Sequence, residues 1–429
     1  MSDQHPTESI GREVQRRIYR AGVYGHRPVV PTAPDALRQA ARRRMTRRGY
    51  AYVAGSAGME TTARANLAAF HRWRIMPRML RDVAVRDLGV ELFGRRLPAP
   101  LLVAPIGVLE LAHRDADLAV ARAGAALGLP VIFSTQASRS VEECAVVMGN
   151  APRWFQLYWS SSDELVESMV ARAEAAGCEA IVVTLDTHLL GWRPRDLDLG
   201  HLPFARGEGI AQYLADPVFN RLVAARAAHS RTDDRLRPTL AAVRTLASVA
   251  RHHPGRFWHN LRSPLPRAAV ETFLDVFSRS SLTWEDLAFL RERTKLPILL
   301  KGILHPNDAA RAMDAGVNGI VVSNHGGRQV DGAIPALAAL PGVVAEVADR
   351  VPVLFDSGIR AGADVFKALA LGARAVCVGR PYVYGLALAG QAGVTAVLSH
   401  LMAELDLTMA LAGYATIPEI GPDSLRRLD

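Results

Sequence analysis

From residue 97 onward, short runs rich in valine, isoleucine and leucine alternate with alanine-rich stretches whose composition favours helix. This alternation is typical of repeated strand–helix units that form a parallel sheet. Eight such units predict an α/β fold of the TIM (β/α)8 barrel type, with a doubly wound open sheet as the alternative. The predicted strands span residues 100–105, 130–134, 153–158, 180–185, 297–301, 319–323, 351–355 and 375–379. Helices are predicted at 115–127, 162–176, 306–315 and 362–371, each beginning near a residue that favours helix N-caps.

The alternation is interrupted between the fourth and fifth predicted strands. The interruption spans residues 187–282 and is far longer than an ordinary connection in such units, so it predicts a lid or small subdomain. Its middle, 221–267, has the pattern of poorly capped helices, and we expect it to be mobile. An insertion of this kind could instead serve subunit packing. We expect an N-terminal helical segment at 1–96, the barrel at 97–390 and a C-terminal helical segment at 391–429.

Composition narrows the class of protein. The formal net charge is +9 over 429 residues, but the arginines are scattered and do not gather with aromatic residues, which argues against nucleic-acid binding. Cys144, Cys178 and Cys377 lack the spacing of a disulfide framework or a zinc site. The N-terminus lacks the apolar stretch of a signal peptide, and no later segment has the roughly 18 uninterrupted apolar residues of a membrane span. We expect a soluble cytoplasmic protein with no metal, nucleic-acid or membrane partner.

Polar residues or glycines stand at the end of every predicted strand. In a barrel of this type the active site lies at the carboxyl ends of the strands, so these positions are its candidates. A single polar residue at a strand end is more often a helix cap or a turn residue. Polar residues or glycines at the ends of all eight strands, however, predict an active site. The candidates are Gly107, Ser134, Gln156, Tyr158, Thr184, Asp186, Lys301, Ser323, His325, Asp356, Gly358, Arg360, Gly379 and Arg380.

Two groups among these candidates indicate specific chemistry. His325 shares a glycine-rich turn with Arg328, and a base beside a fixed cation could take a proton from a substrate whose carboxylate the cation holds. A hydroxyl group next to a carboxylate fits this arrangement. The loops after the last two strands of such barrels commonly bind phosphate, and they contain two glycines and two arginines here. These loop residues therefore predict a phosphorylated ligand: Gly358, Arg360, Gly379 and Arg380. The alternative is that the two arginines are solvated surface residues.

Three motifs resemble the FMN-dependent α-hydroxy-acid oxidizing family. They are Ser-Asn-His-Gly-Gly-Arg-Gln at 323–329, DSGIRAGADVFKALALGARAVCVGRP at 356–381 and AGSAGMETTARANLAAFHRWRIMPRML at 54–80, in the order typical of the family. The resemblance runs from about Tyr50 to Tyr384. GWRPRDL at 191–197, HLPF at 201–204 and the long insertion are most similar to the lactate 2-monooxygenase members of the family.

The resemblance implies FMN as the cofactor and a role for each candidate. Arg193 and Arg328 would hold the substrate carboxylate, with Tyr52 and Tyr158 bonded to the carboxylate or hydroxyl. His325 would take the hydroxyl proton as hydride leaves for the flavin, or the α-proton in a carbanion route. Asp186 would stabilise the His325 ring, and Lys301 would lie beside flavin N1 and the C2 carbonyl. The remaining residues would bind the isoalloxazine, ribityl chain and phosphate: Gly107, Ser134, Gln156, Thr184, Ser323, Asp356, Gly358, Arg360, Gly379 and Arg380.

Some positions depart from the family pattern. Many relatives have Pro-Thr-Ala where this chain has Pro105-Ile106-Gly107. A glycine at 107 removes a methyl group from the flavin face, and we expect it to leave room for oxygen or a retained product. His188 stands where proline is frequent, and Ser357 stands where glycine is common.

The leading hypothesis is oxidation of L-lactate by O2 to acetate, CO2 and water. A 2-hydroxy-acid oxidase or dehydrogenase that releases the 2-keto acid is the alternative among enzymes, and an inactive flavin-binding protein is the alternative outside them. The resemblance also implies a homotetramer or homo-octamer.

Overall fold

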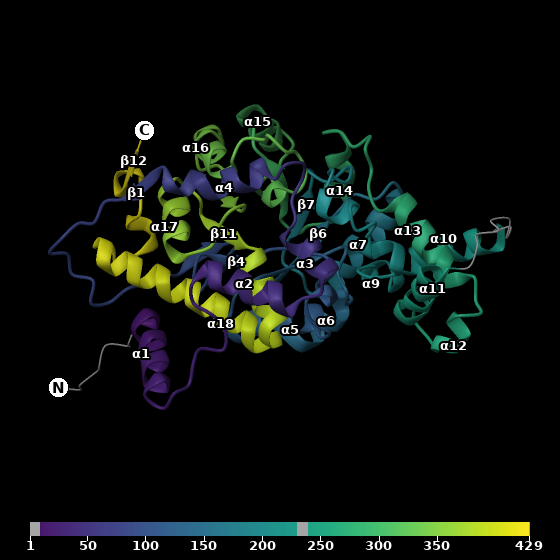
Figure 1. Ribbon diagram of the computed structural model, residues 1–429. Helices are drawn as coiled ribbons and strands as arrows, with labels where there is room; N and C mark the ends of the chain where they lie inside the picture. The colour runs from purple at the N-terminus through teal and green to yellow at the C-terminus, as the bar shows by residue number, and fades with distance from the viewer. Residues whose placement is uncertain (1–8, 230–238, 429) are drawn as a thin grey trace.

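A closed barrel of parallel strands forms the centre of the protein. The structure, a computed structural model, describes residues 9–229 and 239–428. Strands join in the order β10-β11-β4-β5-β6-β7-β8-β9, and every neighbouring pair is parallel. The predicted TIM barrel and its eight strands are therefore confirmed (Figure 1). The strands are β4 (Leu101–Val103), β5 (Val131–Ser134), β6 (Arg153–Leu157), β7 (Ile181–Thr184), β8 (Ile298–Ile303), β9 (Gly319–Val322), β10 (Val353–Phe355) and β11 (Ala375–Val378).

Each barrel strand leads to a helix on the outside of the barrel. The four helices predicted from sequence are α5, α7, α15 and α17, with ends within two residues of the expected positions. Helix α18 is long and apolar enough to cross a membrane by length and composition, but 61% of its most apolar stretch is buried in the protein. The helices are α5 (Ala116–Leu127), α6 (Val141–Met148), α7 (Asp163–Ala175), α14 (Asp286–Arg293), α15 (Pro306–Asp314), α16 (Ala336–Val347), α17 (Gly362–Ala370) and α18 (Arg380–Ala412).

The segments before and after the barrel pair with each other outside it. The N-terminal part has the expected helices α1 (Ile10–Val23), α2 (Pro34–Arg44), α3 (Arg47–Ala54) and α4 (Thr61–His71), and also short strands β1 (Trp73–Ile75), β2 (Val90–Leu92) and β3 (Arg95–Leu97). The C-terminal part, expected to be helical, ends in strand β12 (Leu425–Arg427), which pairs antiparallel with β1. This pairing joins residues too distant in sequence for a local pattern to reveal. Helix α3 carries Tyr52 towards the carboxyl ends of the barrel strands.

The insertion after β7 folds as a group of helices on one side of the barrel, at the right in Figure 1. Its helices surround aromatic side chains that touch one another, including Phe204, Tyr213 and Phe273. The helices that begin within 221–267 were expected to be poorly capped. Helices α12 and α13 indeed have no side-chain cap, but in α11 Thr239 Oγ1 accepts a hydrogen bond from the Ala242 amide at 3.1 Å. Residues 230–238 of the insertion's middle lie outside the described part of the chain. The elements are α8 (Pro194–Leu197), η2 (Pro203–Arg206), α9 (Ala211–Leu214), α10 (Pro217–His229), α11 (Leu240–His252), α12 (Phe257–Asn260) and α13 (Leu265–Val276).

Candidate active site

A cavity opens at the carboxyl ends of the barrel strands, as the sequence predicted. It encloses about 970 Å³ of empty space, counting the part open to solvent. Twelve of the predicted site residues line it: Tyr52, Gly107, Tyr158, Arg193, Lys301, His325, Arg328, Asp356, Gly358, Arg360, Gly379 and Arg380. The other five lie behind this lining, where several bond to it or to one another: Ser134, Gln156, Thr184, Asp186 and Ser323.

His325 and Asp186 form a bonded pair across two loops. His325 Nδ1 lies 2.8 Å from Asp186 Oδ1 and 3.2 Å from Thr187 Oγ1. Burial lowers the pKa of His325, and the Asp186 carboxylate offsets only part of that effect. Burial alone would raise the pKa of Asp186, but the charges of His325 and Lys301 hold it at about 2. Asp186 is therefore ionised, and a neutral His325 can act as a base near neutral pH.

Two guanidinium groups meet at one wall of the cavity. Arg193 Nε donates to the Arg328 carbonyl at 3.1 Å, and the Arg328 guanidinium carbon lies 5.1 Å from the centre of the Tyr52 ring. Burial and the charge of Arg328 lower the pKa of Arg193 to about 10, so it remains a cation at neutral pH. Such a pair of cations favours an anion between them, and their planar forks match a carboxylate.

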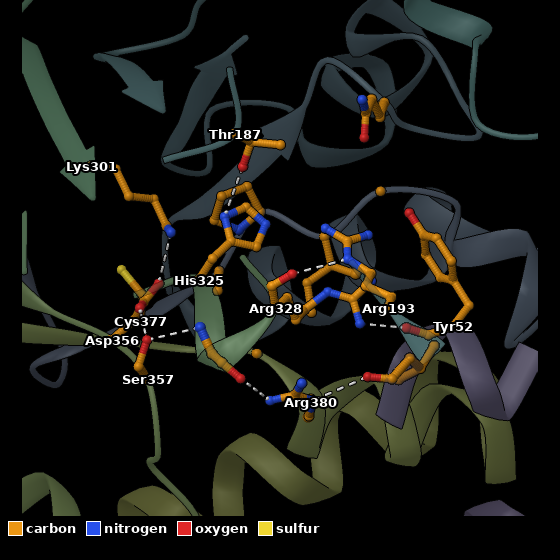
Figure 2. Close-up of a pocket in the computed structure, with 18 of the residues that line it drawn as sticks. Tyr52, Thr187, Arg193, Lys301, His325, Arg328, Asp356, Ser357, Cys377 and Arg380 are labelled. Atoms are coloured by element: carbon orange, nitrogen blue, oxygen red, sulfur yellow. Dashed lines mark hydrogen bonds and ion pairs between the residues drawn. The ribbon is translucent and has the colours of Figure 1, made fainter. Parts of the chain in front are cut away.

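Lys301 is buried within β8, two residues before the strand ends. Its Nζ donates to Ser323 Oγ at 2.9 Å. The same atom lies 3.2 Å from Asp356 Oδ2 (Figure 2). Burial alone would lower the pKa of Lys301, but the carboxylates of Asp356 and Asp186 raise it above its ordinary value. Burial and the Asp186 charge raise the pKa of Tyr158 to about 12, so this side chain keeps its proton and can donate a hydrogen bond. The cavity thus holds a fixed positive charge beside a neutral phenol.

The loops after β10 and β11 bring two arginines to another part of the cavity. Burial lowers the pKa of Arg360 and lowers that of Arg380 to about 9, which is the response of cations held away from water. A Cβ at Gly379 would meet no protein atom closer than 3.5 Å, so the protein alone does not require glycine there. The missing side chain instead leaves space in the cavity for a ligand to approach the backbone. Two arginine side chains and an accessible backbone at Gly379 together suit a phosphate group.

Buried polar atoms without a partner lie at the neighbouring strand ends. Within the part of the chain that the structure describes, these include Gln136 Nε2, Gln156 Nε2 and Thr184 Oγ1. Because buried donors and acceptors are nearly always bonded, such atoms indicate a polar ligand. A flat heterocycle with polar edges and a phosphate tail fits this set, with the phosphate at Arg360 and Arg380. The residues present therefore fit FMN.

The expectation that Gly107 leaves open space is wrong. A Cβ at this position would lie 2.9 Å from both Cβ and the carbonyl oxygen of Gln136, so the neighbouring chain already fills that volume. The Val108 amide also donates to the Gln136 carbonyl at 2.9 Å. Gly107 therefore permits close packing of the loops after β4 and β5, and it creates no room for oxygen or product.

Several lining or bridging residues were not predicted as part of the site. Thr187 could have been found from its place beside Asp186, and Ser357 was noted only as a departure from glycine. Gln136 lies two residues past the end of β5 and was missed although it has the same strand-end signal. Phe204 reaches the cavity from the insertion, and Gln329 bonds the loops together. Each is the last residue of a motif that indicated the family, but neither motif indicated these contacts.

The comparisons with known proteins agree with this geometry. Residues 41–427 match the family described as FMN-dependent dehydrogenase. The chain belongs to this family. It is 41% identical to an FMN-dependent α-hydroxy acid dehydrogenase of Penicillium citrinum, over 96% of this chain and 95% of that one. It is 42% identical to an L-lactate oxidase of Lysinibacillus sphaericus, over 86% of each chain. A solved structure of mandelate oxidase with (S)-4-hydroxymandelic acid has a TM-score of 0.75 at 38% identity, covering 92% and 98% of the two chains.

Membership of the FMN-dependent dehydrogenase family confirms the resemblance found in the sequence. The protein is an FMN-dependent oxidoreductase of 2-hydroxy acids. Bound FMN would supply the electron acceptor for the substrate α-carbon, held by the buried polar atoms and arginines described above. The protein's own residues at this cavity include a bonded histidine–aspartate pair, two arginines and a buried lysine.

Proposed function

We propose that the protein is a lactate 2-monooxygenase, which converts L-lactate and O2 to acetate, CO2 and water. The two arginines bind the lactate carboxylate, and Tyr158 donates to the substrate. His325 takes the hydroxyl proton, and Asp186 stabilises the imidazolium that forms. Lys301 would place its positive charge beside bound FMN, where a cation favours acceptance of electrons. Three apolar side chains are among the residues that line the cavity, and they suit a substrate with a methyl side chain: Ile106, Leu190 and Phe204.

The observation that carries this proposal is the contribution of the insertion to the cavity wall. Phe204 is 2% exposed, lines the cavity and packs on Phe273 with ring centres 5.0 Å apart. Monooxygenation requires the keto acid to stay enclosed until peroxide attacks it, so a cover that slows product release favours this outcome.

Two further contacts tie the insertion to the loop after β4. The Gly209 amide donates to Glu110 Oε1 at 2.9 Å, and His252 Nε2 lies 3.0 Å from Glu110 Oε2. Burial would lower the pKa of His252, but its bond to Glu110 raises it, which favours the ion pair. These contacts support a cover held in place over the cavity.

The test is anaerobic mixing of the FMN-loaded protein with L-lactate, followed by O2 and measurement of acetate, pyruvate and peroxide. Bleaching followed by acetate with little peroxide supports the monooxygenase. Pyruvate with an equal amount of peroxide identifies an oxidase. Bleaching that persists in O2 but reverses with a dye identifies a dehydrogenase. If no 2-hydroxy acid bleaches the flavin, the result supports the inactive flavin-binding protein.

An L-lactate oxidase is the second candidate, and the similarity to the lactate oxidase of Lysinibacillus sphaericus favours it. The same site performs the first half of both reactions, so only the fate of the keto acid distinguishes them. Similarity to mandelate oxidase makes (S)-mandelate the second substrate to assay.

We also propose a cytoplasmic homotetramer or homo-octamer. The three cysteines are free and buried, which is compatible with a reducing compartment. Light scattering of the purified protein measures the oligomer, and a monomer would contradict the proposal.

A further inference from the structure

Ser357 has a backbone conformation that serine rarely adopts. It follows β10, is 7% exposed and has φ of 82°, in the left-handed region that favours glycine. A strained residue persists where its surroundings require its side chain, so the contacts of the hydroxyl group explain why serine is present.

The Ser357 hydroxyl uses its full hydrogen-bonding capacity. It donates to Asp356 Oδ1 at 2.7 Å and accepts from the amides of Asn324 at 3.2 Å and Gly326 at 3.0 Å. A hydroxyl has one donor and two acceptor sites, so none is left for water or substrate. These two amides belong to the residues on either side of His325.

The loop that carries His325 needs such support because its own backbone is unusual. His325, Gly326 and Gly327 all have positive φ, of 55°, 64° and 76°. The amides of four successive residues bond to side-chain oxygens, with His325 N bonded to Ser323 Oγ and Gly327 N to Asn324 Oδ1. Ser323 and Asn324 belong to the same segment, whereas Ser357 reaches the loop from the end of another strand.

The other side of Ser357 leads to Lys301. Asp356 accepts from Ser357 through Oδ1 and faces Lys301 Nζ through Oδ2 at 3.2 Å. We propose that Ser357 is a positioning residue that fixes the His325 loop relative to the Lys301–Asp356 pair. The base and the fixed cation, which both line the cavity, are then held at one separation. Figure 2 shows Ser357 between Asp356 and the backbone of the loop.

Two variants separate the hydroxyl from the backbone strain. S357G removes the hydroxyl and relieves the strain, because glycine tolerates this φ, so the variant should fold. S357A removes the hydroxyl and keeps the strain. The matched control is A348G, which relieves a positive φ of 48° after helix α16, at the amino end of β10.

Both Ser357 variants should increase hydrogen exchange of the 324–326 amides in the FMN-loaded protein. They should also lower kcat by about 10- to 100-fold with little change in KM. A displaced base reduces stabilisation of the transition state more than it reduces substrate binding. A348G should change neither quantity. Conversely, S357G with wild-type exchange and wild-type kcat overturns the proposal.

The inference rests on 2-hydroxy-acid oxidation and not on the choice of lactate. Flavin reduction is measured with L-lactate and with (S)-mandelate, whichever reduces the wild-type protein. The exchange measurement needs no substrate, so its result stands even if the monooxygenase proposal fails. Unchanged exchange in both variants would contradict the role of Ser357 whatever the substrate proves to be.

Discussion

Asp186 Oδ1 lies 2.8 Å from His325 Nδ1, although the two residues are 139 positions apart in the sequence. An ionised carboxylate can only accept, so Nδ1 of the neutral ring must carry the proton. Nε2 therefore has the free lone pair and is the nitrogen able to take a proton from substrate. The pairing thus determines which ring nitrogen acts as the base.

Replacing His325 with glutamine should leave FMN bound and abolish bleaching by substrate. Glutamine retains polarity and approximate size but cannot accept a proton, and loss of a general base costs about 10²- to 10⁴-fold in rate. Anaerobic stopped-flow spectroscopy at the flavin band measures the effect. The matched control is H188Q, because His188 is exposed and bonds only the Leu185 carbonyl among the contacts described. Bleaching at the wild-type rate in H325Q would remove His325 from the mechanism.

Replacing Asp186 with asparagine should move the acid limb of the kcat/KM profile to lower pH. His325 must be neutral to act, so activity is lost as pH falls through its pKa. Burial already lowers this pKa below 6.5, and Asp186 is the main group that raises it. Without the carboxylate the pKa falls further.

The plateau of the same profile should fall by about 10²- to 10⁴-fold, because the imidazolium loses its counter-charge and the ring its orientation. A pH profile of D186N measures both changes. An acid limb that moves to higher pH would contradict the assigned pairing.

The sequence predicts the barrel and half of the residues that line the cavity, because buried strands and their ends have local patterns. A buried parallel strand is a continuous apolar run, and its end is often marked by the first polar residue, as at Thr184 of β7. Because all strands of the barrel are parallel, their carboxyl ends bring these residues to the same end of the barrel. The glycine at 107 was misinterpreted because its neighbour Gln136 comes from another strand end, and local sequence gives no packing distance.

Contacts made by the insertion are not predictable in the same way. Phe204 reaches the cavity only after the insertion folds on the barrel, and nothing in its local pattern separates it from Tyr213, which is buried within the insertion. The pairing of β1 with β12 is missed for a related reason, because each strand is three residues long and its partner is remote. Such short elements have no stable pattern of their own.

Replacing Gln329 with methionine should raise KM more than it lowers kcat. The Gln329 amide donates to the carbonyls of Asp186 at 2.7 Å and Leu189 at 2.8 Å, and its oxygen accepts from Arg193 at 2.8 Å. Methionine keeps the volume but frees Arg193 from its orientation. Loss of a hydrogen bond to a charged group predicts a rise in KM of about 10-fold or more.

A double-mutant cycle with R193K tests whether Gln329 acts through Arg193. The effects of the two substitutions on KM should be less than additive, because each removes the same alignment of the guanidinium. Purely additive effects would show that Gln329 acts only through the loop backbone.

Replacing Phe204 with leucine should shift the products of lactate oxidation from acetate towards pyruvate and peroxide. The phenyl ring is part of the cavity wall, and a smaller side chain opens the cover through which the keto acid can leave. F204L also loosens the packing on Phe273, so its ratio of acetate to pyruvate must be compared with that of a second variant.

F219L is the matched control: Phe219 is fully buried in the insertion and packs on Tyr213, but it does not line the cavity. If both variants release the same fraction of pyruvate, general loosening of the insertion controls product release. If only F204L does so, the wall at Phe204 retains the keto acid, and unchanged products in F204L would show that this wall has no such role.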